Sequence, residues 1–139
     1  QLGEAGVPVA EARKILGNGL LIGRSVHSTE VAVQAELDGS DFLVVGTMYG
    51  SRSHPGEVPA GPGLMEEISK KCHLPLIGIG GVVPENTAEL IESGASGVAV
   101  ITNILAAENP RTAAERLKDI LIVSWNARMN PADLGNGDG

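Results

Sequence analysis

Two residue pairs late in the sequence could bind a phosphate group through their backbone. Gly80 and Gly81 directly follow one apolar run, and Ile101 and Thr102 end and follow another. Adjacent glycines let main-chain N–H groups approach an anion with no Cβ in the way, and the amino terminus of a following helix adds partial positive charge. The two pairs together predict a phosphate site that needs no lysine, whereas a tight strand-to-helix turn is the alternative for an isolated Gly-Gly.

Ser25 and His27 stand at the end of an earlier apolar run, in the string GRSVHS. Imidazole exchanges protons near neutral pH, so His27 could act as a general acid or base. The Ser25 hydroxyl could donate a hydrogen bond to a phosphate oxygen. The alternative for His27 is a structural or capping role, and the sequence leaves both open.

A third group of polar residues lies in the loop 47–61, which is longer than a turn requires. Ser51, Ser53 and His54 bring two hydroxyls and an imidazole together, with Arg52 between them. Such a set suits a phosphate or diphosphate, and a long loop of this kind is often a functional lid. A solvated polar loop is the alternative.

The elements that must position these residues are short apolar strands, each followed by a helix. The expected strands are 19–24, 41–46, 75–80 and 97–101, and the expected helices are 28–37, 63–72, 84–93 and 110–125. Continuously apolar strands indicate a parallel sheet covered on both faces, so the fold class is α/β. In (β/α)₈ enzymes the loops after the last two strands often hold a substrate phosphate. We therefore expect a partial TIM (β/α)₈ barrel made of its four C-terminal βα units.

These elements predict one barrel segment, residues 1–125, followed by a flexible tail rich in Gly, Asn and Asp, residues 126–139. Four βα units cannot close a barrel, because closure needs eight strands of consistent tilt. An upstream half, assembly of two copies as a homodimer, or an open sheet with covered edges would each resolve this, and the sequence does not choose among them.

Composition excludes several classes of function. The net charge of −7 over 139 residues argues against a nucleic-acid binder, which needs clustered Lys and Arg. Cys72 is the only cysteine, so an intrachain disulfide and a multi-cysteine metal site are excluded, and the residues by themselves predict no metal site. No apolar run approaches the roughly 20 residues that span a bilayer. We expect a cytoplasmic protein without membrane partners.

Three strings together resemble the thiamine-phosphate synthase/TenI superfamily. They are IGRSVHS (22–28), GTMYGSRSHPG (46–56) and IGIGGVVPENTAELIESGASGVAVIT (77–102), and the resemblance runs from residue 1 to about residue 121. It implies the C-terminal half of a barrel that acts in thiamine biosynthesis on a small-molecule thiazole phosphate.

The resemblance also implies roles for the residues named above. Backbone amides of Gly80, Gly81, Ile101 and Thr102 would bind the thiazole phosphate. Ser25 would contact the pyrophosphate group, and His27 matches the TenI histidine that moves a proton on the thiazole ring. Ser51, Ser53 and His54 fall where the synthase carries two hydroxyl residues and a lysine.

Departures from the synthase pattern bear on which activity to expect. The synthase shows His-x-Gly-Gln-x-Asp, with an Asp that helps bind Mg²⁺, where this chain has QLGEAG at 1–6. Gly6 cannot ligate a metal, although Glu4 could partly substitute, and His54 replaces a fixed positive charge. We therefore favour a TenI-type thiazole tautomerase without a cofactor. The alternatives are a Mg²⁺-dependent thiamine-phosphate synthase and a non-catalytic half-barrel that binds a phosphate-bearing ligand.

Overall fold

The fold is a four-stranded parallel sheet with helices packed on it, in a computed structural model that describes residues 1–50, 56 and 58–130. The strands are β1 (Gly23–Val26), β2 (Phe42–Val45), β3 (Leu76–Ile79) and β4 (Gly97–Ala99), and they lie in the order β1-β2-β3-β4. Every neighbouring pair is parallel, which requires a crossover between successive strands. The expected α/β class and the four βα units are confirmed.

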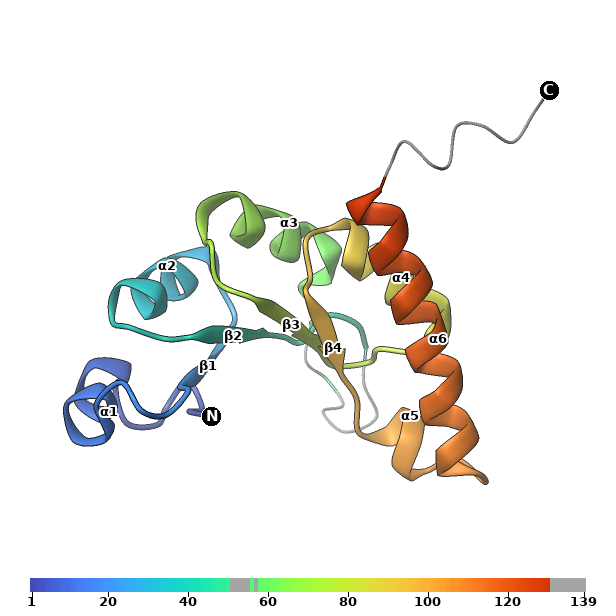
Figure 1. The fold of residues 1–139 in the computed structure, drawn as a ribbon, viewed down its shortest axis with the longest axis horizontal. Helices are drawn as coiled ribbons and strands as arrows, with labels where there is room; N and C mark the ends of the chain where they lie inside the picture. Colours follow the sequence, from blue (N-terminus) through green and yellow to red (C-terminus); the bar gives the residue numbers. More distant parts are fainter. Residues whose placement is uncertain (51–55, 57, 131–139) are drawn as a thin grey trace.

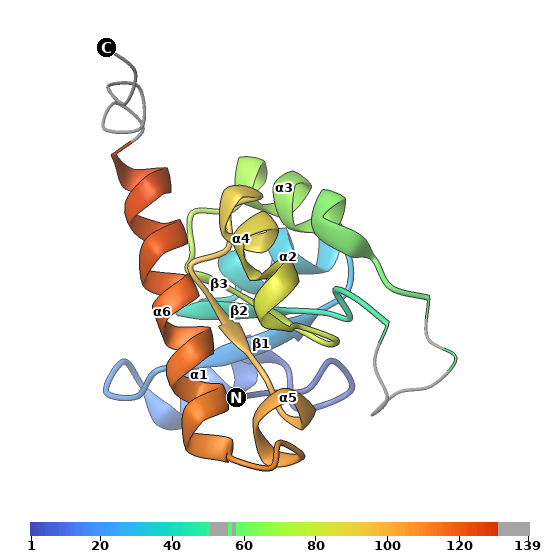
Figure 2. The same ribbon diagram turned by 90° about the vertical axis from the view of Figure 1, so that its right-hand side faces the viewer.

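Helices α2, α3 and α4 provide these crossovers and cover one face of the sheet (Figures 1 and 2). The helices are α1 (Val9–Leu16), α2 (Thr29–Leu37), α3 (Gly61–Lys71), α4 (Pro84–Glu92), α5 (Thr102–Leu105) and α6 (Pro110–Met129). The Ser28 side chain caps the start of α2, since its oxygen accepts a hydrogen bond from the Val31 N–H. Helix α6 packs along α4, beyond the β4 edge (Figure 2).

The main core lies between the sheet and the covering helices. Val26, Leu43, Val45 and Leu76 are at most 2% exposed and point toward side chains such as Met65 of α3 and Leu90 of α4. Alternate strand residues point to the other face, because side chains alternate along a strand. Of these, Phe42, Ile77 and Ile79 are only half-buried. Continuous apolar strands predicted cover on both faces, but within the described chain only one face is fully covered.

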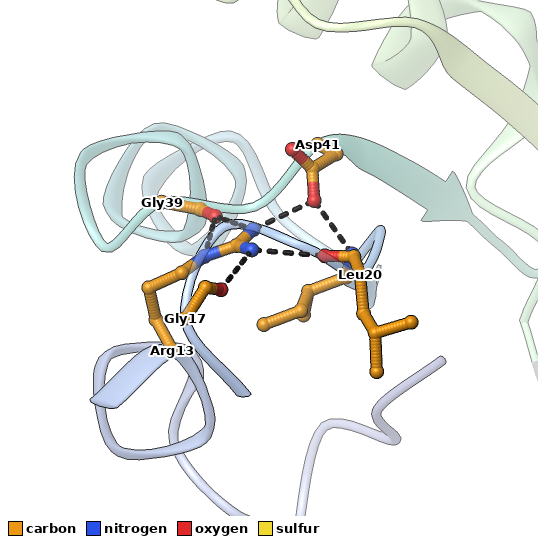
Figure 3. A network of polar contacts seen from close by, with 6 residues as sticks. Arg13, Gly17, Leu20, Gly39 and Asp41 are labelled. Carbon is orange, nitrogen blue, oxygen red and sulfur yellow. Dashed lines mark hydrogen bonds and ion pairs between the residues drawn. The ribbon is translucent and has the colours of Figure 1, made fainter. Parts of the chain in front are cut away.

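An arginine network sets where β1 begins (Figure 3). The Arg13 guanidinium on α1 donates to the carbonyl oxygens of Gly17 (3.0 Å), Leu20 (2.9 Å) and Gly39 (2.6 Å), and to Asp41 Oδ2 at 2.6 Å. The segment after α1 is therefore held as a loop. The strand expected at 19–24 instead occupies Gly23–Val26, and Leu20 and Leu21 are exposed.

The amino-terminal region contains two elements that the sequence analysis missed. Helix α1 was not expected, and Leu2 forms an isolated parallel bridge with Arg24 at the outer edge of β1. The Leu2 N–H donates to the Gly23 carbonyl at 2.7 Å, and the Ser25 N–H donates to the Leu2 carbonyl at 2.9 Å. This bridge places residues 1–6 beside the carboxyl end of β1.

The last helix is longer than the sequence predicted. Helix α6 ends at Met129, so the expected boundary at residue 125 falls inside it. Arg128 accounts for the extension, because its Nη1 donates to the carbonyl oxygens of Ile91 (2.7 Å) and Ala95 (2.8 Å) at the end of α4. Residues 131–139 of the predicted tail lie outside the described residues. None of the described helices has the length and apolar character needed to cross a membrane.

Candidate functional site

A cavity of about 560 Å³ opens at the carboxyl ends of the strands. It is lined by six of the residues singled out from the sequence: Ser25, His27, Gly80, Gly81, Ile101 and Thr102. They meet because parallel strands end at the same edge of a sheet, so the residues that follow each strand become neighbours. Val44 of β2, Ile79 of β3 and Ala99 of β4 supply an apolar wall.

The Gly80-Gly81 turn has a backbone that only glycine adopts easily. Their φ angles are +96° and +61°, in the left-handed region. A Cβ on Gly80 would lie 2.6 Å from Thr47 Cγ2, and one on Gly81 would lie 2.7 Å from the Tyr49 carbonyl oxygen. Both glycines are thus required by the backbone itself and by the close approach of residues 47–50.

Residues 47–50 are hydrogen-bonded to the end of β3, and two of them, Thr47 and Gly50, line the cavity. The Met48 N–H donates to the Ile79 carbonyl and the Tyr49 N–H donates to the Gly80 carbonyl, both at 2.9 Å. The Tyr49 hydroxyl donates to Glu89 Oε2 on α4 at 2.7 Å. Burial, followed by this contact with a carboxylate, raises the pKa of Tyr49 well above its usual value. The hydroxyl therefore remains a donor that ties this segment to α4.

Helix α4 begins directly behind the glycine turn. Pro84 occupies its first turn, and the Asn86 side chain closes the amino terminus. Asn86 Oδ1 accepts from the Val83 N–H at 2.9 Å, while Asn86 Nδ2 donates to the Gly81 carbonyl at 3.1 Å. Asn86 thus fixes both the Gly81 carbonyl and the Val83 N–H, and the amino terminus of α4 places its partial positive charge behind the turn.

The second predicted turn, after β4, leads into the short helix α5. The Leu105 N–H donates to the Ile101 carbonyl at 2.9 Å, which bends the chain at Ile101 and Thr102 back along the cavity. Asn103 also lines the cavity, and its Oδ1 atom is buried with no hydrogen-bond partner in the described part of the chain. A polar atom in that position is a candidate contact for a ligand donor.

Ser25 and His27 are held from the amino-terminal segment. Gln1 Nε2 donates to Ser25 Oγ at 2.6 Å, and His27 Nδ1 lies 2.8 Å from Glu4 Oε2. The Glu4–His27 contact was not predicted, because it joins residues 23 positions apart that lie on different elements. The sequence suggested Glu4 as a partial substitute for a metal ligand. In the structure, its carboxylate contacts the imidazole of His27 instead.

The remaining predicted residues cannot be placed in this site. Ser51, Ser53 and His54 lie outside the described residues. Among the residues that are described, no group of three His, Cys, Asp or Glu side chains is arranged to hold a metal ion. Mg²⁺ is commonly held by one or two carboxylates together with substrate phosphates, and the described residues form no metal cluster of their own.

Comparison with known proteins places the chain in a family. Residues 1–104 match the family model described as thiamine monophosphate synthase. The chain belongs to this family. It is 41% identical over 121 residues to the thiamine-phosphate synthase of Natronomonas pharaonis, covering 85% of this chain and 56% of the relative. It is 38% identical over 122 residues to that of Moorella thermoacetica, covering 86% of this chain and 58% of the relative.

A solved structure agrees with the sequence relatives. The thiamine phosphate pyrophosphorylase of Pyrococcus furiosus superimposes with a TM-score of 0.80 at 33% identity, covering 89% of this chain and 59% of that one. The chain thus spans little more than half the length of these thiamine-phosphate synthase relatives. The family resemblance seen in the sequence and the partial-barrel fold are both confirmed.

Proposed function

We propose that the protein acts as a thiamine-phosphate synthase, joining a pyrimidine diphosphate to a thiazole phosphate with release of pyrophosphate. The observation that carries this proposal is the identity of about 40% to proteins named as synthases over more than four-fifths of the chain. The sequence analysis favoured the tautomerase, but the relatives favour the synthase. The proposal concerns the whole protein, because the chain spans only part of each relative.

The cavity would hold the thiazole phosphate at the two turns. Main-chain N–H groups of Gly80 and Gly81 and of Ile101 and Thr102 would bind the phosphate oxygens, and the adjacent amino terminus of α4 would favour the negative charge. The apolar wall of Val44, Ile79 and Ala99 would contact the thiazole ring. This arrangement suits an acidic protein, since it binds an anion without a lysine.

The coupling step needs no net proton transfer. The bond between the pyrimidine methylene carbon and the diphosphate oxygen breaks, and pyrophosphate leaves with the electron pair. The thiazole nitrogen then donates its lone pair to that carbon, which forms the new C–N bond. Ser25 and His27 line the same cavity and would contact the pyrophosphate. Ser51, Ser53 and His54, outside the described residues, would contribute from the loop before α3.

Magnesium would supply charge neutralisation to the departing pyrophosphate in a synthase. Among the described residues, no group of three His, Cys, Asp or Glu side chains is arranged to hold it. The role of this segment in the proposed reaction is to bind and orient the thiazole phosphate.

The tautomerase is the second candidate, and one contact favours it. His27 lines the cavity and is held by the Glu4 carboxylate at 2.8 Å, an arrangement that suits a general base. Tautomerisation requires such a proton shuttle together with a phosphate handle, and both would be present here.

The test is to incubate the whole protein with pyrimidine diphosphate, thiazole phosphate and Mg²⁺. The synthase predicts thiamine phosphate and pyrophosphate in equal amounts. Tautomer conversion without pyrophosphate would instead establish the second candidate. If the protein binds thiazole phosphate but catalyses neither reaction, it is a non-catalytic half-barrel that binds a phosphate-bearing ligand. If it does not bind thiazole phosphate, the proposed phosphate site is wrong.

A further inference from the structure

The segment that carries Glu4 is fixed against β1 on both sides of that residue. On one side, Leu2 exchanges two backbone hydrogen bonds with the strand, at 2.7 and 2.9 Å. On the other, the Arg24 guanidinium donates to the carbonyl oxygens of Glu4 (2.7 Å) and Val7 (3.1 Å). A further bond, from the Gly6 N–H to the Gly3 carbonyl at 2.8 Å, closes the turn around Glu4. The backbone of Glu4 is therefore held in place independently of its side chain.

The side chain of Glu4 reaches His27 through one ring nitrogen. Glu4 Oε2 lies 2.8 Å from His27 Nδ1, an ion-pair contact within hydrogen-bonding distance. Two lone pairs at that separation would repel each other, and a carboxylate oxygen can only accept, so the contact favours a proton on Nδ1. In a neutral imidazole, Nε2 then carries the lone pair.

We propose that Glu4 is a positioning residue that keeps the proton of His27 on Nδ1 and so presents Nε2 as a proton acceptor to the cavity. That His27 faces a ligand there rests on the proposed function, whereas the tautomer itself does not. Ser25 lines the cavity beside His27, and its hydroxyl accepts a hydrogen bond from Gln1, which belongs to the same amino-terminal segment as Glu4.

The contact between Glu4 and His27 is open to solvent, so we expect it to contribute little to the stability of the fold. The side chains of His27 and Glu4 are 52% and 44% exposed, and ion pairs in water contribute little to folding. A substitution at Glu4 should therefore leave the fold intact while it changes the proton position on the ring.

Nitrogen-15 NMR of the histidine side chains in the full 139-residue chain tests this directly. The spectra are recorded at a pH above which the ring shifts no longer change, and the His27 signals are assigned by their loss in His27→Gln. We expect the Nδ1–H tautomer in the unsubstituted protein and Nε2–H as the major form in Glu4→Ala. Glu30→Ala, which removes the same charge from an exposed position on α2, should leave the Nδ1–H form unchanged.

A second variant keeps the test decisive if Glu4→Ala does not fold, as judged by its backbone amide spectrum. Glu4→Lys places a donor-only group at the position, so any contact with Nδ1 requires the lone pair there and again predicts Nε2–H. Finding Nε2–H in the unsubstituted protein, or an unchanged Nδ1–H form in the folded Glu4 variants, would overturn the proposal. Because no substrate is used, this result is separate from failure of the proposed synthase activity.

Discussion

Replacing Gly81 with alanine tests whether the glycine turn is shaped by its contact with residues 47–50. Gly81 has a φ of +61°, and a left-handed conformation costs a residue with a Cβ about 1–2 kcal/mol. The added Cβ would also lie 2.7 Å from the Tyr49 carbonyl oxygen, and overpacking of this kind costs about 1–3 kcal/mol. We therefore expect Gly81→Ala to lower the free energy of unfolding by about 2–5 kcal/mol in total.

Gly61→Ala is the matched control, because it separates backbone strain from crowding. Gly61 has a similar φ of +71°, but a Cβ added there would meet no heavy atom within 4 Å. The control should lose only the strain contribution, about 1–2 kcal/mol. Urea unfolding of both variants, followed by circular dichroism, measures the difference. Equal losses in the two variants would refute the crowding argument.

The same pair of variants connects the turn to ligand binding. To accommodate the Cβ, the Gly81 turn must move away from Tyr49, which displaces the N–H groups that we assign to the phosphate. Calorimetric titration should show thiazole phosphate binding at least roughly tenfold more weakly to Gly81→Ala, since misplaced anion donors lose charge-assisted hydrogen bonds of about 1.5–3 kcal/mol. Binding by Gly61→Ala should be unchanged. Unaltered binding in a folded Gly81→Ala would remove this turn from the site.

Two further predictions concern the contacts that hold the sheet and α6. The Ile22 N–H, followed by Arg13, lowers the pKa of Asp41, so its contribution to stability is present above the ordinary value of 3.8 and is lost as pH falls below it. The urea midpoint should fall less steeply below about pH 4 in Asp41→Asn than in the unsubstituted protein, and parallel pH profiles would contradict this. Arg128→Ala removes two charge-assisted hydrogen bonds and a guanidinium 4.8 Å from the Trp125 ring centre, and should cost about 1.5–3 kcal/mol. The fluorescence of Trp125, the only tryptophan, reports this unfolding, and a midpoint equal to that of Arg111→Ala, whose ion pair is exposed, would count against it.

The parts of the fold that were predictable from sequence depend on local signals. Apolar runs marked β2, β3 and β4, of which the first two end in glycine, and Pro84 marked the first residue of α4. The cavity followed from the same signals, because parallel strands bring the residues after them to one edge. Gly80 and Ile101 could therefore be assigned to one site from their positions alone.

The features that were missed depend on contacts between distant residues. Arg13 binds the carbonyl of Gly39, 26 positions away, and so helps to fix the loop before β1. The apolar run in the sequence could not indicate where that loop ends. Arg128 extends α6 by bonding Ala95, 33 positions away. Glu4 lies beside His27 because Leu2 pairs with β1 and Arg24 binds the Glu4 carbonyl. Side chains that bind backbone carbonyls leave no periodic pattern in a sequence, so only the structure reveals them.

The register of the sheet supports the proposed phosphate site in a segment that spans only part of the length of its relatives. Val26 pairs with Val45, Val45 with Gly78, and Ile79 with Ala99, so the chain leaves all four strands at nearly the same level. The proposed phosphate donors follow β3 and β4, which are adjacent, and the walls beside them come from this chain alone. No strand outside the described sheet is needed to bring the two turns together. We therefore expect this segment to bind phosphate by itself, whereas the proposed coupling reaction concerns the whole protein.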